Sequence, residues 1–163
     1  EIIANALGAN TNEIYFTAGG SESDNWALKA TAEAYKAKGN HIITTKIEHH
    51  AILHTAEWLE KNGFEVTYLN VDENGVVKLE ELKKAIRPET ILISIMFANN
   101  EIGTIQPIAE IAKGLRRRSP NALLHVDAVQ AFGKMPCTDC DEGVVTIKSG
   151  EVIKVPVNFW LPF

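Results

Sequence analysis

The sequence predicts an α/β fold with a mainly parallel sheet flanked by helices, and three observations support this prediction. Short apolar and β-branched runs alternate with stretches whose apolar residues recur at helical spacing. The run at 91–97 is almost entirely apolar, as is typical of a central parallel strand covered on both faces. Polar residues directly follow several of these runs, where ligands gather in open α/β sheets.

The elements follow in order from the amino end. Residues 1–7 are typical of the end of a helix that stops at Gly8, so the chain is expected to begin within a domain. Gly39 and Asn40 end the second helix, and Pro107 fits the first position of the last one. Strands are expected at 14–17, 41–45, 64–69, 91–97 and 123–126, a turn at 72–75, and helices at about 24–35, 52–59, 79–86 and 107–118.

Composition bounds the class of protein. The 163 residues fit one ordinary domain, and 45% hydrophobic with 23% charged residues is a globular composition. A net charge of -5 argues against a nucleic-acid partner, and the basic run 116–118 closes a predicted helix, where cations suit the dipole. Because no apolar stretch is long enough to cross a bilayer and the first residues lack the basic start of a signal peptide, we expect no membrane contact and a cytoplasmic location.

The two cysteines, Cys137 and Cys140, have Cys-x-x-Cys spacing. This spacing admits a redox pair or half of a metal site, but two cysteines are too few for a disulfide scaffold. Because no second pair supplies the missing ligands, two incidental thiols are favoured and no metal site is expected.

A small-residue loop at 18–23 joins the first predicted strand to a helix and is suited to seat a phosphate. Its glycines let the backbone approach closely, the N–H groups of the first helical turn attract an anion, and Ser21 adds a hydroxyl. The alternative is an ordinary helix start with Ser21 or Ser23 as the N-cap. The loop is neither a Walker A nor a G-x-G-x-x-G sequence.

Polar residues follow two further strands. His49 and His50 come after one of them, and a flat imidazole stacks on an aromatic ring or moves a proton at neutral pH. A metal pair is disfavoured because adjacent histidines diverge. Asn99 and Asn100 come after the apolar run and offer donors and acceptors to a polar ligand, although asparagine also stabilises turns.

The strand at 123–126 leads directly to Asp127, which small residues and Gln130 follow. A carboxylate one step past a buried strand is well placed to meet a ligand cation. The alternative is an aspartate that caps a turn or the next helix.

The last part of the chain, 137–163, has no long helical period. Residues 144–147 and 151–155 flank Ser149 and Gly150 like a hairpin, and the apolar terminus at 159–163 predicts contact with a partner surface. We therefore expect a division between 1–136 and a divergent tail, 137–163.

Taken together, the motifs resemble those of cysteine desulfurases of the NifS and IscS type, in the class V aminotransferase group of fold-type-I pyridoxal phosphate enzymes. The resemblance covers residues 1–136 and implies that they are part of the large cofactor-binding domain. It rests on four segments in the family's order and with similar spacing: 16–25, 48–51, 99–103 and 125–130.

The resemblance implies a role for each cofactor-binding residue. Gly20 and Ser21 would hold the cofactor phosphate, and His49 would stack on the pyridine ring. Asp127 would keep the ring nitrogen protonated, because a cationic pyridinium accepts electrons from the substrate carbanion.

Two residues would border the substrate side of the ring. Gln130 would bond to the phenolic oxygen, and Asn100 would lie beside the substrate and the same edge of the ring. His49 and Asn100 are therefore the candidate catalytic residues that the resemblance implies.

After residue 136 the sequence departs from the family. Relatives carry a lysine in a Ser-Gly-His-Lys type motif, about one strand beyond the aspartate, and it forms the Schiff base that holds the cofactor. Here residues 149–152 read Ser-Gly-Glu-Val, and neither Lys148 nor Lys154 has the motif around it. Cys137 and Cys140 precede the lysine position and do not match the sulfur-accepting cysteine. A truncated chain without the smaller C-terminal domain and its substrate-binding arginine is expected.

The resemblance implies an enzyme that uses pyridoxal phosphate to convert L-cysteine to alanine and an enzyme-bound persulfide for iron–sulfur cluster assembly. It also implies a homodimer and an iron–sulfur scaffold protein as partners. Two alternatives stay open: another class V enzyme, such as a selenocysteine lyase or an aminotransferase, and a non-catalytic remnant that binds the cofactor weakly or serves as an interaction surface.

Overall fold

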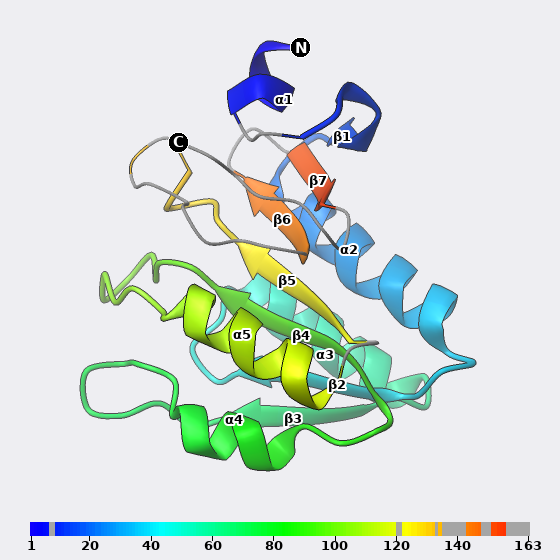
Figure 1. The fold of residues 1–163 in the computed structure, drawn as a ribbon, viewed down its shortest axis with the longest axis vertical. Helices are drawn as coiled ribbons and strands as arrows, with labels where there is room; N and C mark the ends of the chain where they lie inside the picture. Colours follow the sequence, from blue (N-terminus) through cyan, green and yellow to red (C-terminus); the bar gives the residue numbers. More distant parts are fainter. Residues whose placement is uncertain (7–8, 120–121, 133, 135–142, 148–150, 156–163) are drawn as a thin grey trace.

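The computed structural model describes residues 1–6, 9–119, 122–132, 134, 143–147 and 151–155. In this part of the chain, seven strands form one sheet in the order β1-β7-β6-β5-β4-β2-β3 (Figure 1). The strands are β1 (Ile14–Phe16), β2 (His41–Thr45), β3 (Glu65–Leu69), β4 (Thr90–Met96), β5 (Leu123–Asp127), β6 (Gly143–Ile147) and β7 (Glu151–Val155). The helices are α1 (Ile2–Ala6), the 3-10 helix η1 (Thr11–Glu13), α2 (Gly20–Tyr35), α3 (His50–Lys61), α4 (Leu79–Ala85) and α5 (Ile108–Arg118).

The sheet is mainly parallel. Strands β3, β2, β4, β5 and β6 run in one direction, whereas β7 is antiparallel to both β6 and β1. The predicted fold class is therefore confirmed. The parallel arrangement brings the carboxyl ends of β2, β4 and β5 to one edge of the sheet.

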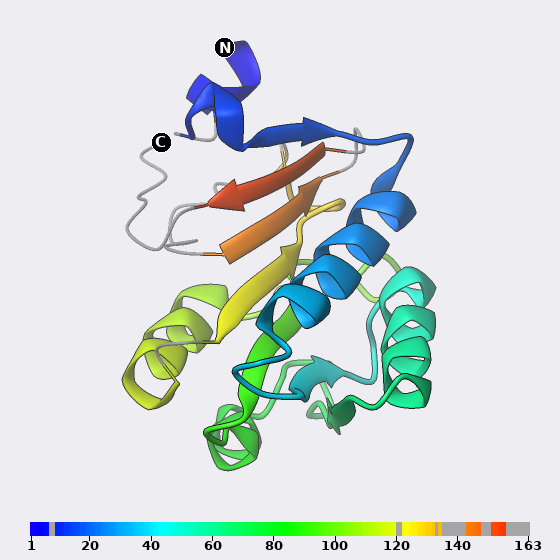
Figure 2. The same ribbon diagram turned by 90° about the vertical axis from the view of Figure 1, so that its right-hand side faces the viewer.

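Helices cover both faces of the sheet, with α2 and α3 on one face and α4 and α5 on the other (Figure 2). Because successive strand residues point to opposite faces, Ile42 packs into the core under α2 and α3, whereas Ile43 packs into the core under α4 and α5. Val126 of β5 also belongs to the core under α4 and α5. His125 and Asp127, on either side of Val126, therefore face α2 and α3.

Several boundaries differ from the sequence predictions by one to a few residues, and three of them concern the site or its helices. Helix α2 begins at Gly20 with Gly19 as its N-cap and no side-chain cap, so the alternative of Ser21 or Ser23 as the N-cap is wrong. Pro107 is the N-cap of α5 and not its first helical residue. Asp127 is the last residue of β5 and does not lie one step past it. Each shift is of one to a few residues, where local propensity is weakest.

The two strands predicted near the carboxyl end are present as β6 and β7, and they pair antiparallel. They belong to the same sheet as the rest of the chain, because β6 also pairs parallel with β5. A division at residue 136 stays a prediction. Gly8, Cys137, Cys140, Lys148, Ser149, Gly150 and the apolar terminus at 159–163 lie outside the described residues. Among the described residues, none of the helices has the length and apolarity needed to traverse a bilayer.

Candidate active site

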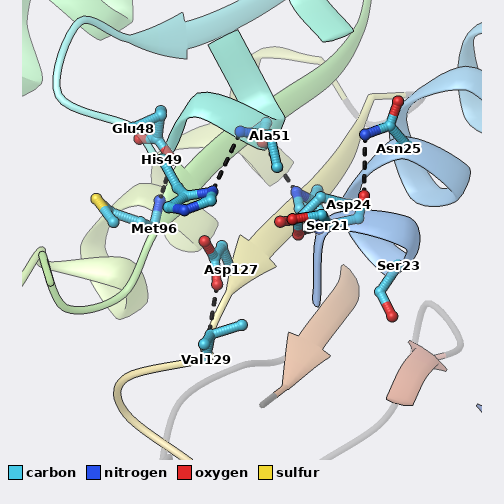
Figure 3. A network of polar contacts seen from close by, with 12 residues as sticks. Ser21, Ser23, Asp24, Asn25, Glu48, His49, Ala51, Met96, Asp127 and Val129 are labelled. Atoms are coloured by element: carbon cyan, nitrogen blue, oxygen red, sulfur yellow. Dashed lines mark hydrogen bonds and ion pairs between the residues drawn. The ribbon is translucent and has the colours of Figure 1, made fainter. Parts of the chain in front are cut away.

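A cavity of about 250 Å³ lies where β4 and β5 end, beside the amino ends of α2 and α3. All six residues predicted for the site line it, although they come from four separate segments of the sequence. Figure 3 shows Ser21, His49 and Asp127 converging from α2, the start of α3 and the end of β5. The lining residues are Gly20, Ser21, Asp24, His49, Met96, Ala98, Asn100, Asp127, Val129 and Gln130.

At one end of the cavity, the first turn of α2 offers backbone donors. The first bonds within the helix run back to Gly19 O, with Ser23 N donating at 3.1 Å. The N–H groups of Gly20 and Ser21 precede these bonds and have no acceptor within the helix. Thr17 Oγ1 steadies the turn by contacting Gly19 O at 3.1 Å and Ser23 Oγ at 2.6 Å. This end is therefore suited to an anion, and the dipole of the 16-residue helix adds to the attraction.

The chain after β5 passes close to Gly20. A Cβ on Gly20 would lie 3.1 Å from Val129 Cγ2, which is tighter than ordinary van der Waals contact. A larger residue would push the two walls of the cavity apart where the backbone donors are exposed.

The carboxylate of Asp127 also lines the cavity and is only 5% exposed. Oδ1 accepts a hydrogen bond of 3.0 Å from Val129 N. Burial raises the pKa of Asp127, while this backbone bond and the nearby His49 lower it. A carboxylate in so dry a place is stabilised by a cationic partner, so this part of the cavity suits a protonated ring nitrogen.

His49 is the N-cap of α3, and its imidazole is held by the backbone of the next turn. Nδ1 accepts a hydrogen bond of 3.1 Å from Ala51 N. In the neutral ring Nδ1 is thus the acceptor and Nε2 carries the proton. The ring is otherwise exposed at the cavity, which leaves its flat face available to an aromatic ligand.

Asn100 and Gln130 lie at the rim of the cavity. Asn100 is exposed in the turn that follows β4. Gln130 stands in the turn after β5, and its Oε1 accepts from Lys134 Nζ at 3.0 Å. Both amides thus offer polar groups at the open side of the cavity.

Sequence reasoning missed Asp24, which is 2% exposed on α2 and lines the cavity. Its Oδ1 lies 3.7 Å from Nε2 of His125, whose Nδ1 contacts Ser94 Oγ at 2.8 Å. Burial lowers the pKa of His125 to about 3, so this histidine is neutral beneath the site. The spacing of Ser21 and Asp24, three residues apart on one helical face, was the available signal.

Sequence reasoning also assigned no role to Glu48, the residue before His49. Its side chain is 5% exposed, and its two oxygens accept from Thr45 Oγ1 at 2.6 Å and from Met96 N at 2.9 Å. Burial is the main cause that raises the pKa of Glu48 to about 8. A charged residue between a strand and a histidine was the signal in the sequence.

The side chains at the cavity indicate what kind of ligand it suits. Within the described ranges, no cluster of three or more His, Cys, Asp or Glu side chains is arranged to hold a metal ion. The donors at the cavity are instead a helix amino end, a buried carboxylate, an imidazole and two amides. That set fits a flat organic anion with a basic ring nitrogen.

The model of the family described as Aminotransferase class-V matches residues 1–145. The chain belongs to the class V aminotransferase family. Among relatives, "Cysteine desulfurase IscS" of Clostridium botulinum (strain Kyoto / Type A2) is 65% identical over 133 residues, which are 82% of this chain and 33% of the relative. The chain thus spans about a third of the length of the curated relatives it matches.

Solved structures of this class V type agree with the fold. A "NifS-like protein" superposes with a TM-score of 0.88 at 40% identity, covering 96% of this chain and 46% of the other. A structure titled "SspA in complex with cysteine" superposes with a TM-score of 0.85 at 37% identity, covering 94% and 47%. The predicted resemblance to NifS-like and IscS-like proteins and the partial large domain of the fold-type-I class are confirmed.

Proposed function

We propose that this chain is the cofactor-binding part of a cysteine desulfurase and that its cavity binds pyridoxal phosphate. One observation carries the proposal. Residues from four segments meet in one cavity, and the backbone N–H groups at the start of α2 and the buried carboxylate of Asp127 both line it. Pyridoxal phosphate carries a phosphate and a basic pyridine nitrogen at separate positions of one flat ring, which matches this polarity.

The residues that line the cavity fit the two charged groups of the cofactor. The backbone of Gly20 and Ser21, with the Ser21 hydroxyl, would hold the phosphate. The Asp127 carboxylate would accept a hydrogen bond from the protonated ring nitrogen. The attraction within this ion pair would offset the cost of burying the carboxylate. The imidazole of His49, fixed by Ala51 N, would lie against the ring.

When bound, pyridoxal phosphate supplies an electron sink for the bonds of an amino-acid substrate. The chain's own residues orient the cofactor and the substrate and keep the ring nitrogen protonated. Asp127 keeps the ring nitrogen cationic, Gln130 offers an amide to the phenolic oxygen, and Asn100 offers a donor and an acceptor to the substrate. With Nδ1 accepting from Ala51 N, Nε2 is the donor that the neutral His49 ring offers at the cavity.

The substrate in this proposal is L-cysteine, and the products are alanine and a protein-bound persulfide for iron–sulfur cluster assembly. Support comes from relatives named cysteine desulfurase at up to 65% identity and from a neighbour solved with cysteine. A homodimer, an iron–sulfur scaffold partner and a cytoplasmic location belong to the same proposal.

The test is a titration of the chain with pyridoxal phosphate, followed by borohydride reduction and mass spectrometry. Saturable binding with a labelled lysine, and alanine formed from cysteine, would support a desulfurase. Saturable binding without a labelled lysine or alanine would favour the non-catalytic remnant. A keto acid formed in place of alanine would identify an aminotransferase, and turnover of selenocysteine alone would identify a selenocysteine lyase. Absence of saturable binding would contradict the proposal.

A further inference from the structure

Two neighbouring loops beside the cavity are joined by side chains that have no assigned role. One loop, 46–49, follows β2, and the other, 97–107, follows β4. Glu48 Oε2 accepts from Met96 N at 2.9 Å, and Asn99 Nδ2 donates to Ile47 O at 2.8 Å. Each loop therefore sends one side chain to the backbone of the other strand or loop.

Each of these side chains also makes hydrogen bonds to its own loop or to the strand that precedes it. Glu48 Oε1 accepts from Thr45 Oγ1 at 2.6 Å. Asn99 Oδ1 accepts from the backbone N–H groups of Glu101 at 2.8 Å and Ile102 at 2.9 Å. Glu48 is 5% exposed and Asn99 is 8% exposed, so water competes little for these bonds.

The two joined residues each precede a residue that lines the cavity. Glu48 precedes His49, and Asn99 precedes Asn100. Figure 3 shows the bond from Glu48 to Met96 directly beside the His49 ring. Movement of either loop relative to the other would change the distance between His49 and Asn100.

We propose that Glu48 and Asn99 are positioning residues that fix His49 and Asn100 relative to each other at the cavity. The effect of this positioning on catalysis rests on the proposed function. The positioning itself is a property of the chain without any ligand, and it is testable separately.

Three variants separate the contacts. Glu48→Ala removes both bonds of Glu48, whereas Glu48→Gln keeps them, because the amide oxygen accepts from Met96 N and the amide nitrogen donates to Thr45 Oγ1. Asn99→Asp keeps the acceptor for Glu101 N and removes the Nδ2 donor, which contacts both Ile47 O and Met96 Sδ.

The matched control is Gln106→Glu. Gln106 is a 2% exposed amide in the same β4–α5 loop, and it also makes one donor bond and one acceptor bond to backbone. Its Nε2 donates to Gly75 O at 2.7 Å and its Oε1 accepts from Val77 N at 2.9 Å, away from the cavity. The control thus removes a comparable buried bond of the same loop, and leaves the bonds between the two loops in place.

The first readout is the imidazole NMR spectrum of His49 in ring-labelled protein without cofactor, with a His49→Gln sample for assignment. We expect Glu48→Ala and Asn99→Asp to shift the His49 signals, and Glu48→Gln and Gln106→Glu to leave them in place. The second readout is the dissociation constant for pyridoxal phosphate. We expect it to rise about tenfold in Glu48→Ala and Asn99→Asp and to stay unchanged in Glu48→Gln and Gln106→Glu.

Unchanged His49 signals in a folded Glu48→Ala, or an equal shift in Gln106→Glu and Asn99→Asp, would overturn the inference. If Glu48→Ala does not fold, the comparison of Asn99→Asp with Gln106→Glu is sufficient to test the positioning inference. A wild-type chain that does not bind the cofactor would contradict the proposed function, while the histidine spectra would still decide the positioning.

Discussion

Gly20 on α2 and Val129 after β5 are in such close contact that a Cβ on the glycine would lie 3.1 Å from Val129 Cγ2. The turn that brings Val129 there begins at Asp127, whose Oδ1 accepts from Val129 N at 3.0 Å. The same short turn therefore orients the buried carboxylate and closes the wall beside the anion-binding end. One piece of backbone thereby sets the Asp127 carboxylate and the start of α2 relative to each other.

Gly20→Ala is expected to weaken binding of pyridoxal phosphate about five- to tenfold, because the added methyl pushes Val129 away and opens the phosphate end. Alanine is a good residue for the first turn of a helix, so the fold itself should tolerate it. A titration of the variant followed by fluorescence quenching measures the loss. The double variant Gly20→Ala/Val129→Ala should regain most of the affinity, and failure to regain it would show that crowding is not the cause.

Glu48→Gln is expected to change how stability depends on pH. The pKa of Glu48 is raised from 4.5 to about 8, so the folded state keeps a proton that the unfolded state releases over that range. The wild type should then lose stability relative to Glu48→Gln as pH rises from about 4.5 to about 8, by up to ~1.4 kcal/mol per pH unit, and the difference should level off above pH 8.

Urea unfolding of both proteins at a series of pH values measures this difference. Glu101→Gln, which changes an exposed glutamate of the β4–α5 loop, is the control and should run parallel to the wild type. A constant difference between Glu48→Gln and the wild type over the whole range would mean that Glu48 is ionised in the fold.

His125 should remain neutral well below the usual range for histidine. Burial lowers its pKa from 6.5 to about 3, so the stability it contributes is present above pH 6.5 and is lost as pH falls toward 3. Ring-labelled NMR should show constant His125 signals from pH 8 to pH 5. A midpoint at or above 6.5 would contradict this and would mean that the carboxylate of Asp24, 3.7 Å from Nε2, outweighs burial.

Much of the fold follows from local patterns in the sequence. The almost entirely apolar strand β4 is buried at every position, which is typical of a central parallel strand. The polar residues after β2, β4 and β5 reach one edge, because parallel strands end on the same side. The hairpin near the carboxyl end was also visible, but its pairing with β1 was not, since β1 lies more than 100 residues earlier in the chain.

The residues that sequence reasoning missed owe their properties to distant contacts. The pKa of Glu48 is raised because the fold buries it, and the hydrogen bond from Met96 N, which lowers the pKa, offsets only part of this effect. Asp24 looks like an ordinary helix residue until His125, a hundred positions later, is placed next to it by the packing of α2 on β5. Helix α2 starts earlier than predicted because Gly19 adopts an extended conformation and accepts the first helical bonds.

The most direct test of the account is a titration of pyridoxal phosphate into the wild-type chain and into Asp127→Asn, with Glu101→Gln as the charge control. We expect saturable binding of one cofactor per chain in the wild type and in the control. In Asp127→Asn the affinity should fall roughly ten- to a hundredfold, because the buried partner of the ring nitrogen is lost, while thermal unfolding shows the variant still folded. Absence of saturable binding in the wild type, or equal affinity in Asp127→Asn, would contradict the account.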